Sequence, residues 1–250
     1  MSNPLRRLAP LVLVAGLAGA VHAQDTPNLG QDQAQGPQPP VVGGLRPALS
    51  FNVGIASDYV FRGVSQTDEE GQVYAGADAT AGDFYAGVWG SNVKFAGDAD
   101  TEVEVDLYGG WRPQVAGYDL DLGALYYAYP GQPSGAEYDY FELKAAGSRS
   151  IGPVSGGLAA YWTPEYFAQA GNALYLEANA GVEVGPGALI TGALGRQEID
   201  AGGDYTTWNL GLALSLTDNL TLDGRYWDTD AEALGAIYDS RVVFGLKAAF

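Results

Sequence analysis

The stretch from Thr101 to Tyr129 constrains the fold more than any other feature, because apolar and polar residues alternate along it with a strict period of two. Val103 and Leu107 belong to the odd, apolar set, whereas Glu104 and Asp106 belong to the even, polar set. After a short break at residues 113–117 the alternation resumes. This period is typical of a β-strand with one apolar and one polar face. The stretch therefore predicts a hairpin whose apolar face meets either a second sheet or lipid.

The same period recurs along the rest of the chain, and no helical period of any length accompanies it. We therefore predict an all-β chain with twelve strands. The expected strands are Leu49–Arg62, Gln72–Thr80, Phe84–Phe95, Thr101–Arg112, Tyr118–Tyr129, Tyr138–Gly147, Val154–Thr163, Ala173–Val184, Leu189–Ile199, Tyr205–Leu216, Leu220–Thr229 and Ser240–Phe250.

The alternation also assigns a face to most residues of these strands. In the first strand Tyr59 and Phe61 fall on the apolar face, which would point outward, and in the third strand Tyr85 and Trp89 do so. The glycine-rich strands near residues 72–80 and 189–199 leave the phase open, because a shift by one residue exchanges the two faces of a strand.

The connections between the expected strands alternate in length. Short turns fall at residues 81–83, 113–117, 151–153, 185–188 and 217–219. Longer or more acidic loops fall at residues 63–71, 96–100, 130–137, 164–172, 200–204 and 230–239. Tight periplasmic turns opposite longer extracellular loops are typical of a transmembrane antiparallel up-and-down β-barrel. We expect residues 48–250 to form such a barrel, with both of its ends on the periplasmic side.

The N-terminus has the features of an export signal. Arg6 and Arg7 precede an apolar run at residues 8–21, and small residues stand at Val21 and Ala23. We expect residues 1–23 to be a signal peptide cleaved after Ala23, since the run is too short to span a membrane comfortably. Residues 24–47 are rich in Gln, Pro, Gly and Asp, so we expect a disordered segment.

Charge and cysteine content exclude several kinds of partner. The formal net charge is −18, and without the two leader arginines ten basic residues face thirty acidic ones, a balance of −20. Nucleic acid is excluded as a partner, because phosphate binding needs clustered Lys and Arg. The chain has no cysteine, so it has no disulfide and no thiolate metal site.

The C-terminal strand carries a second feature of exported barrels. Apolar residues alternate to a terminal phenylalanine. A soluble edge strand of this kind would be an exposed template for pairing, which natural proteins usually avoid. We predict that it is the signal read by the barrel-insertion machinery, formed by Val242, Phe244, Gly245, Leu246, Ala248 and Phe250.

Several short motifs together resemble a known family. They are SDYVFRGVSQ at residues 57–66, FYAGVWGSNV at 84–93, EVDLYGG at 104–110, WTPEYF at 162–167 and DTD at 228–230. In this combination the chain resembles the TorF family of porins, the Gcw_chp proteins, over residues 51–250. The resemblance implies an outer-membrane β-barrel of Gram-negative bacteria with a porin role. It implies no particular solute.

The residue types leave little room for catalysis. The only histidine, His22, lies in the leader, so the exported chain has no Ser/His or Cys/His nucleophile and few options for a transition metal. A paired-carboxylate hydrolase would need a site such as Glu102, Glu104 and Asp106. A solvated acidic wall explains that row more simply. We expect no catalytic residues, no cofactor and no metal site, and we take the acidic runs at 67–70 and 228–230 as solvated loops rather than Ca²⁺ sites.

The polar face of the strands predicts an acidic lumen. Rings of Asp and Glu favour cations in a pore, and a twelve-stranded barrel leaves a narrow channel at most. If the basic residues pair with the acidic ones, the lumen is plugged instead. The expected pore-lining charges are Asp58, Arg62, Asp78, Glu102, Glu104, Asp106, Arg112, Asp119, Asp121, Glu142, Lys144, Glu177, Glu183, Asp223 and Arg225.

The sequence therefore predicts an outer-membrane porin through which small cationic or neutral solutes diffuse, with membrane lipid as its surroundings. A closed barrel with a structural, adhesive or partner-binding role through its acidic extracellular loops is the main alternative. A secreted soluble sandwich ranks third, and detergent dependence would argue against it.

Overall fold

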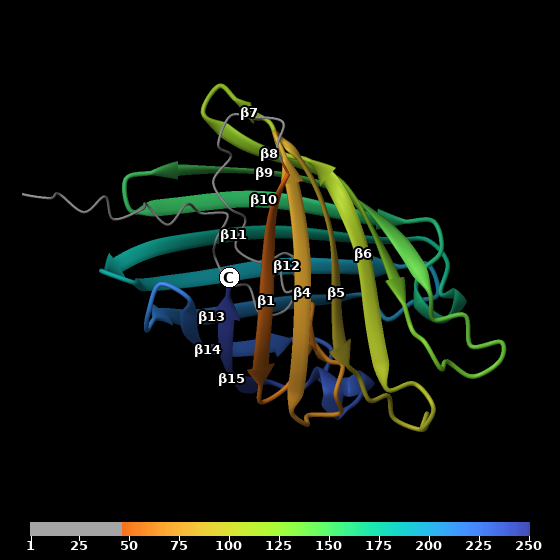
Figure 1. Cartoon of the computed structure of the whole chain (residues 1–250). Helices are drawn as coiled ribbons and strands as arrows, with labels where there is room; N and C mark the ends of the chain where they lie inside the picture. Colours follow the sequence, from red (N-terminus) through yellow and green to blue (C-terminus); the bar gives the residue numbers. More distant parts are fainter. Residues whose placement is uncertain (1–46) are drawn as a thin grey trace, which may run out of the picture.

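The computed structural model describes residues 47–250, so the predicted signal peptide and almost all of the segment that follows it lie outside the described residues. Twelve long strands form one closed antiparallel barrel, in which each strand pairs with its neighbours in sequence (Figure 1). The strands are β1 (Ala48–Ala56), β4 (Gln72–Ala81), β5 (Phe84–Asn92), β6 (Val103–Trp111), β8 (Tyr118–Ala128), β9 (Tyr140–Ile151), β10 (Val154–Thr163), β11 (Ala173–Gly185), β12 (Ala188–Ile199), β13 (Tyr205–Ser215), β14 (Leu220–Thr229) and β15 (Arg241–Ala249).

The first and last strands close the barrel. β1 pairs antiparallel with β15, with Ile55 opposite Leu246. Closure removes the free sheet edges that would otherwise expose unpaired backbone groups. The predicted twelve-stranded up-and-down barrel is confirmed.

Several short elements connect these strands in the described part of the chain. They are β2 (Val60–Phe61), β3 (Val64–Ser65), β7 (Gln114–Val115), and the 3₁₀ turns η2 (Phe167–Gln169), η3 (Glu232–Leu234) and η4 (Ala236–Tyr238). Within residues 47–250 there is no helix long and apolar enough to cross a membrane.

The two rims of the barrel differ in the length of their connections. One rim carries short turns, and Gly82, Gly152 and Gly187 adopt positive φ there, a conformation that costs glycine little. The other rim carries the longer connections at residues 57–71, 93–102, 129–139, 164–172, 200–204 and 230–240. We refer to them below as the short-turn rim and the long-loop rim.

The outer face of the barrel is apolar. Leu49 and Leu158 are each 68% exposed and Phe244 is 62% exposed, whereas their neighbours along each strand point inward. Large apolar residues exposed all around a closed barrel are typical of a lipid-facing surface. Most polar side chains of the strands lie on the opposite face, inside the barrel.

The structure corrects two of the predicted strands. The first strand ends at Ala56 instead of Arg62. In β5 the phase is reversed, because Tyr85 and Trp89 point inward while Phe84 and Val88 face outward. The aromatic residues of β5 led to the wrong phase, since the strand has no charged residue and both of its faces hold large apolar side chains.

The structure also shows which face of β4 and of β12 points inward, a point that the sequence left open. In β4 the even positions, including Gln72 and Asp78, point into the barrel. In β12 the odd positions do so, and Gln197 is fully buried. Each of these strands therefore contributes polar side chains to the interior.

Candidate functional site

The connection between β1 and β4 folds into the barrel instead of extending away from it. This segment comprises Ser57–Glu70. Its strands β2 and β3 pair with each other in a two-stranded sheet that is separate from the barrel. We call the segment the inner hairpin. Its turn is Arg62–Gly63, where φ is 49° and 85°. Positive φ at both central residues is the geometry of the type I′ turn that favours two-residue hairpins.

Arg62, at the tip of the inner hairpin, spans the interior to the opposite wall. Its guanidinium donates two hydrogen bonds to Glu142 of β9, at 2.7 and 2.8 Å, and one to Gln197 of β12 at 3.1 Å. The Arg62 and Glu142 side chains are each only 1% exposed. The guanidinium also lies 5.0 Å from the ring centroid of Tyr161 and 4.5 Å from that of Tyr175. A bidentate, desolvated pair fixes the tip firmly.

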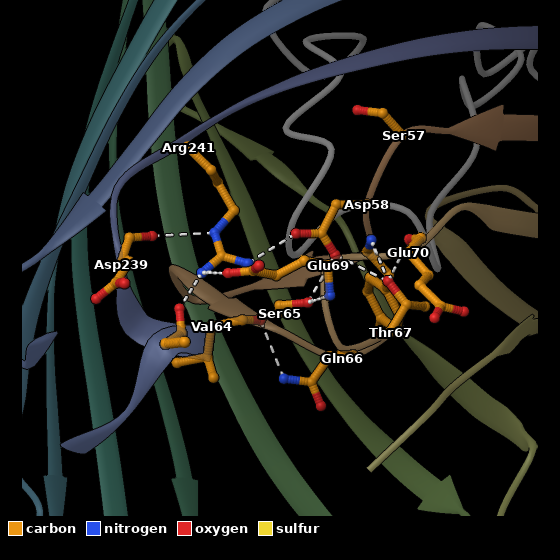
Figure 2. A network of polar contacts seen from close by, with 12 residues as sticks. Ser57, Asp58, Val64, Ser65, Gln66, Thr67, Glu69, Glu70, Asp239 and Arg241 are labelled. Atoms are coloured by element: carbon orange, nitrogen blue, oxygen red, sulfur yellow. Dashed lines mark hydrogen bonds and ion pairs between the residues drawn. The ribbon is translucent and has the colours of Figure 1, made fainter. Parts of the chain in front are cut away.

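A second network holds the base of the hairpin, as Figure 2 shows. Asp58 accepts hydrogen bonds from the hydroxyls of Ser65 at 2.7 Å and Thr67 at 2.8 Å. Arg241, at the start of β15, donates to the other Asp58 carboxylate oxygen at 2.9 Å and lies 3.4 Å from Glu69. The hairpin is therefore tied both to itself and to the closing strand of the barrel.

Aromatic and apolar packing fills the space beside the hairpin. The Tyr59 hydroxyl donates to Glu104 of β6 at 2.9 Å, and its ring meets Trp89 edge-on with centroids 5.5 Å apart. On the other flank Val64 packs with Tyr205 and Ala231. At this level the lumen is filled by side chains of the hairpin and the wall.

A repeated pairing of tyrosine with carboxylate lines the interior. In each pair a Tyr hydroxyl donates a hydrogen bond of 2.6 to 3.0 Å to a carboxylate, so the acidic groups are held by neutral donors as well as by cations. The pairs are Tyr59–Glu104, Tyr85–Asp121, Tyr108–Asp78, Tyr127–Glu142 and Tyr175–Glu177.

Two groups of ion pairs lie between the inner hairpin and the short-turn rim. Asp121 of β8 accepts from Arg112 at 3.1 Å and lies 2.9 Å from Lys144. On the other side of the barrel, Arg225 of β14 reaches Asp223 at 3.1 Å and Asn209 at 2.7 Å. The sequence predicts a plugged lumen if basic residues pair with the acidic ones. The structure shows such pairing around Asp121 and around Arg225.

The structure buries most of the predicted pore-lining charges inside the barrel, although their role in a pore stays a prediction. The charges buried there as wall residues are Asp78, Glu104, Asp106, Glu142, Lys144, Glu177, Asp223 and Arg225, with Arg112 and Asp121 half-buried. Asp58 and Arg62 are buried as well, but on the inner hairpin, not on a wall strand. Asp119 is half-buried near the short-turn rim.

Two of the expected positions differ. Glu102 precedes β6 and is exposed, because the strand begins only at Val103. Glu183 is exposed near the end of β11, where the register shifts between Glu183 and Gly185. A terminal irregularity of this kind has no signature in the period-2 pattern.

Sequence reasoning missed several residues that hold the hairpin. Gln197 lies on a strand whose phase was open, and Arg241 was not singled out. Tyr59 was placed on the outer face. The Arg-Gly pair at the turn was the available local signal, since glycine favours the second position of a type I′ turn. Among residues 47–250 no three His, Cys, Asp or Glu side chains are grouped so as to hold a metal ion.

The C-terminal strand presents its predicted insertion signal on the outside of the barrel. Val242, Phe244 and Phe250 are exposed by 56%, 62% and 70%, whereas Gly245 points inward. The exposed side chains are accessible to lipid or to a protein that recognises this strand. Recognition itself stays a prediction.

The fold is that of a transmembrane β-barrel of the outer-membrane porin type. A structure described as "KdgM porin" aligns with a TM-score of 0.57 and 9% identity, covering 80% of this chain and 99% of that one. The NanC porin aligns with a TM-score of 0.54 and 9% identity, covering 81% and 99%. Outer membrane phospholipase A from Escherichia coli aligns at 0.46 with 14% identity, covering 87% and 95%.

The chain belongs to the family described as "Bacterial protein of unknown function (Gcw_chp)", whose sequence pattern matches residues 44–250. Comparison with curated proteins gives no match. The predicted family is thus confirmed under its Gcw_chp description.

Proposed function

We propose that this protein is an outer-membrane channel of the TorF type for small cationic or neutral solutes, and that the structure represents its closed conformation. The observation that carries the proposal is the inner hairpin. Its tip is buried in the interior, where Arg62 and Glu142 are each 1% exposed, yet β2 and β3 form a separate sheet that is not part of the barrel wall. A plug held mainly by side chains can leave without breaking the barrel, whereas wall strands cannot.

The contacts of the hairpin support a movable element. Its backbone makes few hydrogen bonds to the rest of the barrel, for example from Ser57 N to Phe244 O of β15 at 2.9 Å and from Lys94 N, in the connection after β5, to Gln66 O at 2.8 Å. The stronger ties are the side-chain groups at Arg62 and Asp58. Arg62 also has φ of 49°, a conformation that costs a non-glycine residue energy and often occurs at switch regions.

The test is the single-channel conductance of the detergent-refolded chain in a planar bilayer. Wild-type protein is expected to be mostly closed with brief openings. Replacing Arg62 by Gln removes the charge that holds the tip, and is expected to raise the open fraction by about tenfold or more. Arg196→Gln is the matched control, because Arg196 is an exposed residue of β12 that pairs with Asp204 and lies away from the hairpin.

The result has to be read on folded protein. Slower migration of boiled than of unboiled samples in electrophoresis shows that the barrel has formed. If the wild type and Arg62→Gln are both folded and neither shows conductance, the channel proposal is wrong.

A closed barrel with a structural, adhesive or partner-binding role is the second candidate, and the burial of the interior favours it. Arg62, Glu142 and Gln197 are at most 1% exposed, so solvent does not reach these side chains in this conformation. In that case no hairpin substitution produces conductance, and loss of function maps to the acidic long loops.

A further inference from the structure

A row of small residues crosses the outer face of the barrel from β9 to β13. The strand registers place Arg149 opposite Gly156, Gly156 opposite Ala180, Ala180 opposite Gly192, and Gly192 opposite Leu210. All five lie on the lipid-facing side, because they share the alternation of exposed residues such as Leu158 and Leu194. Gly and Ala have little or no side chain, so the surface sinks along the middle of this row.

The depression is a groove of about 620 Å³ with apolar walls. Ala180 and Gly192 form its floor, and the larger side chains of the two flanking rows form its sides. Its lining includes Val154, Ala178, Ala180, Ile190, Gly192 and Leu194. An elongated hydrocarbon chain can fill a groove of this kind and make dispersion contacts along its whole length.

The row ends at an unusual cation. Arg149 is exposed on the outer face and lies over the ring of Tyr118, with 5.1 Å from the guanidinium carbon to the ring centroid. In the part of the chain that the structure describes, it forms no ion pair, whereas Arg196, on the outer face near the opposite rim, pairs with Asp204 at 3.6 Å. A guanidinium at the edge of the apolar surface is suited to bind a phosphate.

The register also shows how the groove is oriented in the membrane. Arg149 stands two residues from the end of β9, next to the turn at Gly152, whereas Leu210 lies near the middle of β13. The row therefore starts at the short-turn rim and runs into the apolar belt. Neighbouring strands are about 4.8 Å apart, so Ala180, two strands from Arg149, lies within reach of a chain whose head group contacts Arg149.

We infer that the outer face of β9 to β13 binds one glycerophospholipid molecule, with its phosphate on Arg149 and Tyr118 and an acyl chain in the groove over Ala180 and Gly192. The Arg149 guanidinium recognises the head group, and the small residues Ala180 and Gly192 leave space for the acyl chain. A lipid held in this way differs from the surrounding bilayer lipid by its phosphate-dependent affinity.

The test is native mass spectrometry of the full chain in detergent, titrated with palmitoyl-oleoyl phosphatidylglycerol. Wild-type protein is expected to retain one lipid. Arg149→Gln removes a charge-assisted contact and is expected to weaken binding by about tenfold. Ala180→Leu fills the groove and is expected to weaken binding to a similar extent while leaving Arg149 in place. Diacylglycerol with the same chains, which lacks the phosphate, is expected to compete poorly.

Two variants act as controls. Arg196→Gln removes an outward arginine at the other rim, and Ala75→Leu adds the same side chain to an exposed position of β4; both are expected to bind as the wild type. The inference is overturned if Arg149→Gln and Ala180→Leu also bind as the wild type, or if diacylglycerol competes as well as phosphatidylglycerol. It is equally overturned if Ala180→Leu dissociates a dimer without changing lipid retention, since the groove would then accommodate a second copy of the chain.

Discussion

At the scale of single residues, the stability of the interior depends on pairs that are buried together. Arg62 and Glu142 are each 1% exposed, so either one alone would be an uncompensated charge. We predict that Glu142→Gln destabilises the folded barrel by about 3–5 kcal/mol. The double variant Arg62→Met/Glu142→Gln should recover much of that loss, because no charge is then left unpaired. Urea unfolding in detergent measures both, and additive losses in the double variant would contradict the coupling.

Asp98 lies outside the membrane-spanning strands, and its hydrogen bonds lead to a prediction about pH. The Thr101 hydroxyl donates to Asp98 at 2.5 Å and the Asp100 N–H donates at 2.9 Å. These bonds lower the pKa of Asp98 from its ordinary 3.8. The lowered pKa means that the carboxylate stabilises this loop above pH 3.8, and that the contribution is lost as the pH falls through the folded-state value.

Replacing Thr101 by Val should therefore raise the pKa of Asp98 toward its ordinary value. The Asp98 carboxyl chemical shift, titrated by NMR on the protein in micelles, measures the change. Thr206→Val is the control, since its hydroxyl contacts Arg196. An unchanged Asp98 titration in Thr101→Val would show that the backbone donors alone hold the carboxylate.

At the scale of elements, the inner hairpin needs a glycine at its turn. Gly63 has φ of 85°, and a Cβ atom there would overlap the side chain of Thr207 and approach Thr229. We predict that Gly63→Val displaces the hairpin while leaving the barrel folded, because a β-branched residue is strained at positive φ. Limited proteolysis within residues 57–70 should become faster. Gly82→Val has the same backbone strain in an open turn at the opposite rim and should leave this cleavage unchanged.

The elements also show what the sequence could and could not define. The period of two located the barrel strands, because lipid outside and polar groups inside impose opposite chemistry on alternate residues. The same rule extended the first strand through Tyr59 and Phe61, since nothing local marks the point after Ala56 where the chain leaves the wall. Arg62 and Glu142 are 80 residues apart, so their pairing depends on the closed barrel and has no local signature.

At the scale of the whole molecule, the interior is more acidic than basic. Within residues 47–250 the buried charged side chains comprise seven carboxylates and three cations. Arg62 and Asp58 belong to the inner hairpin and would leave the lumen together if it moved out, so that six of these carboxylates and two of these cations remain on the wall. The opened channel would then be lined mainly by carboxylates such as Glu104 and Asp106, and an acidic wall concentrates cations near it.

We therefore predict that the open channel, obtained with Gly63→Val or Arg62→Gln, has a reversal potential of cationic sign across a tenfold salt gradient. Removing two wall charges with Glu104→Gln and Asp106→Asn in the same background should shift that potential toward zero, because both side chains lie inside the barrel on β6. Neutralising Glu183, which is exposed near the end of β11, should change it little. An anionic reversal potential in the open variants would show that the basic residues of the wall, not the carboxylates, set the field that a solute meets.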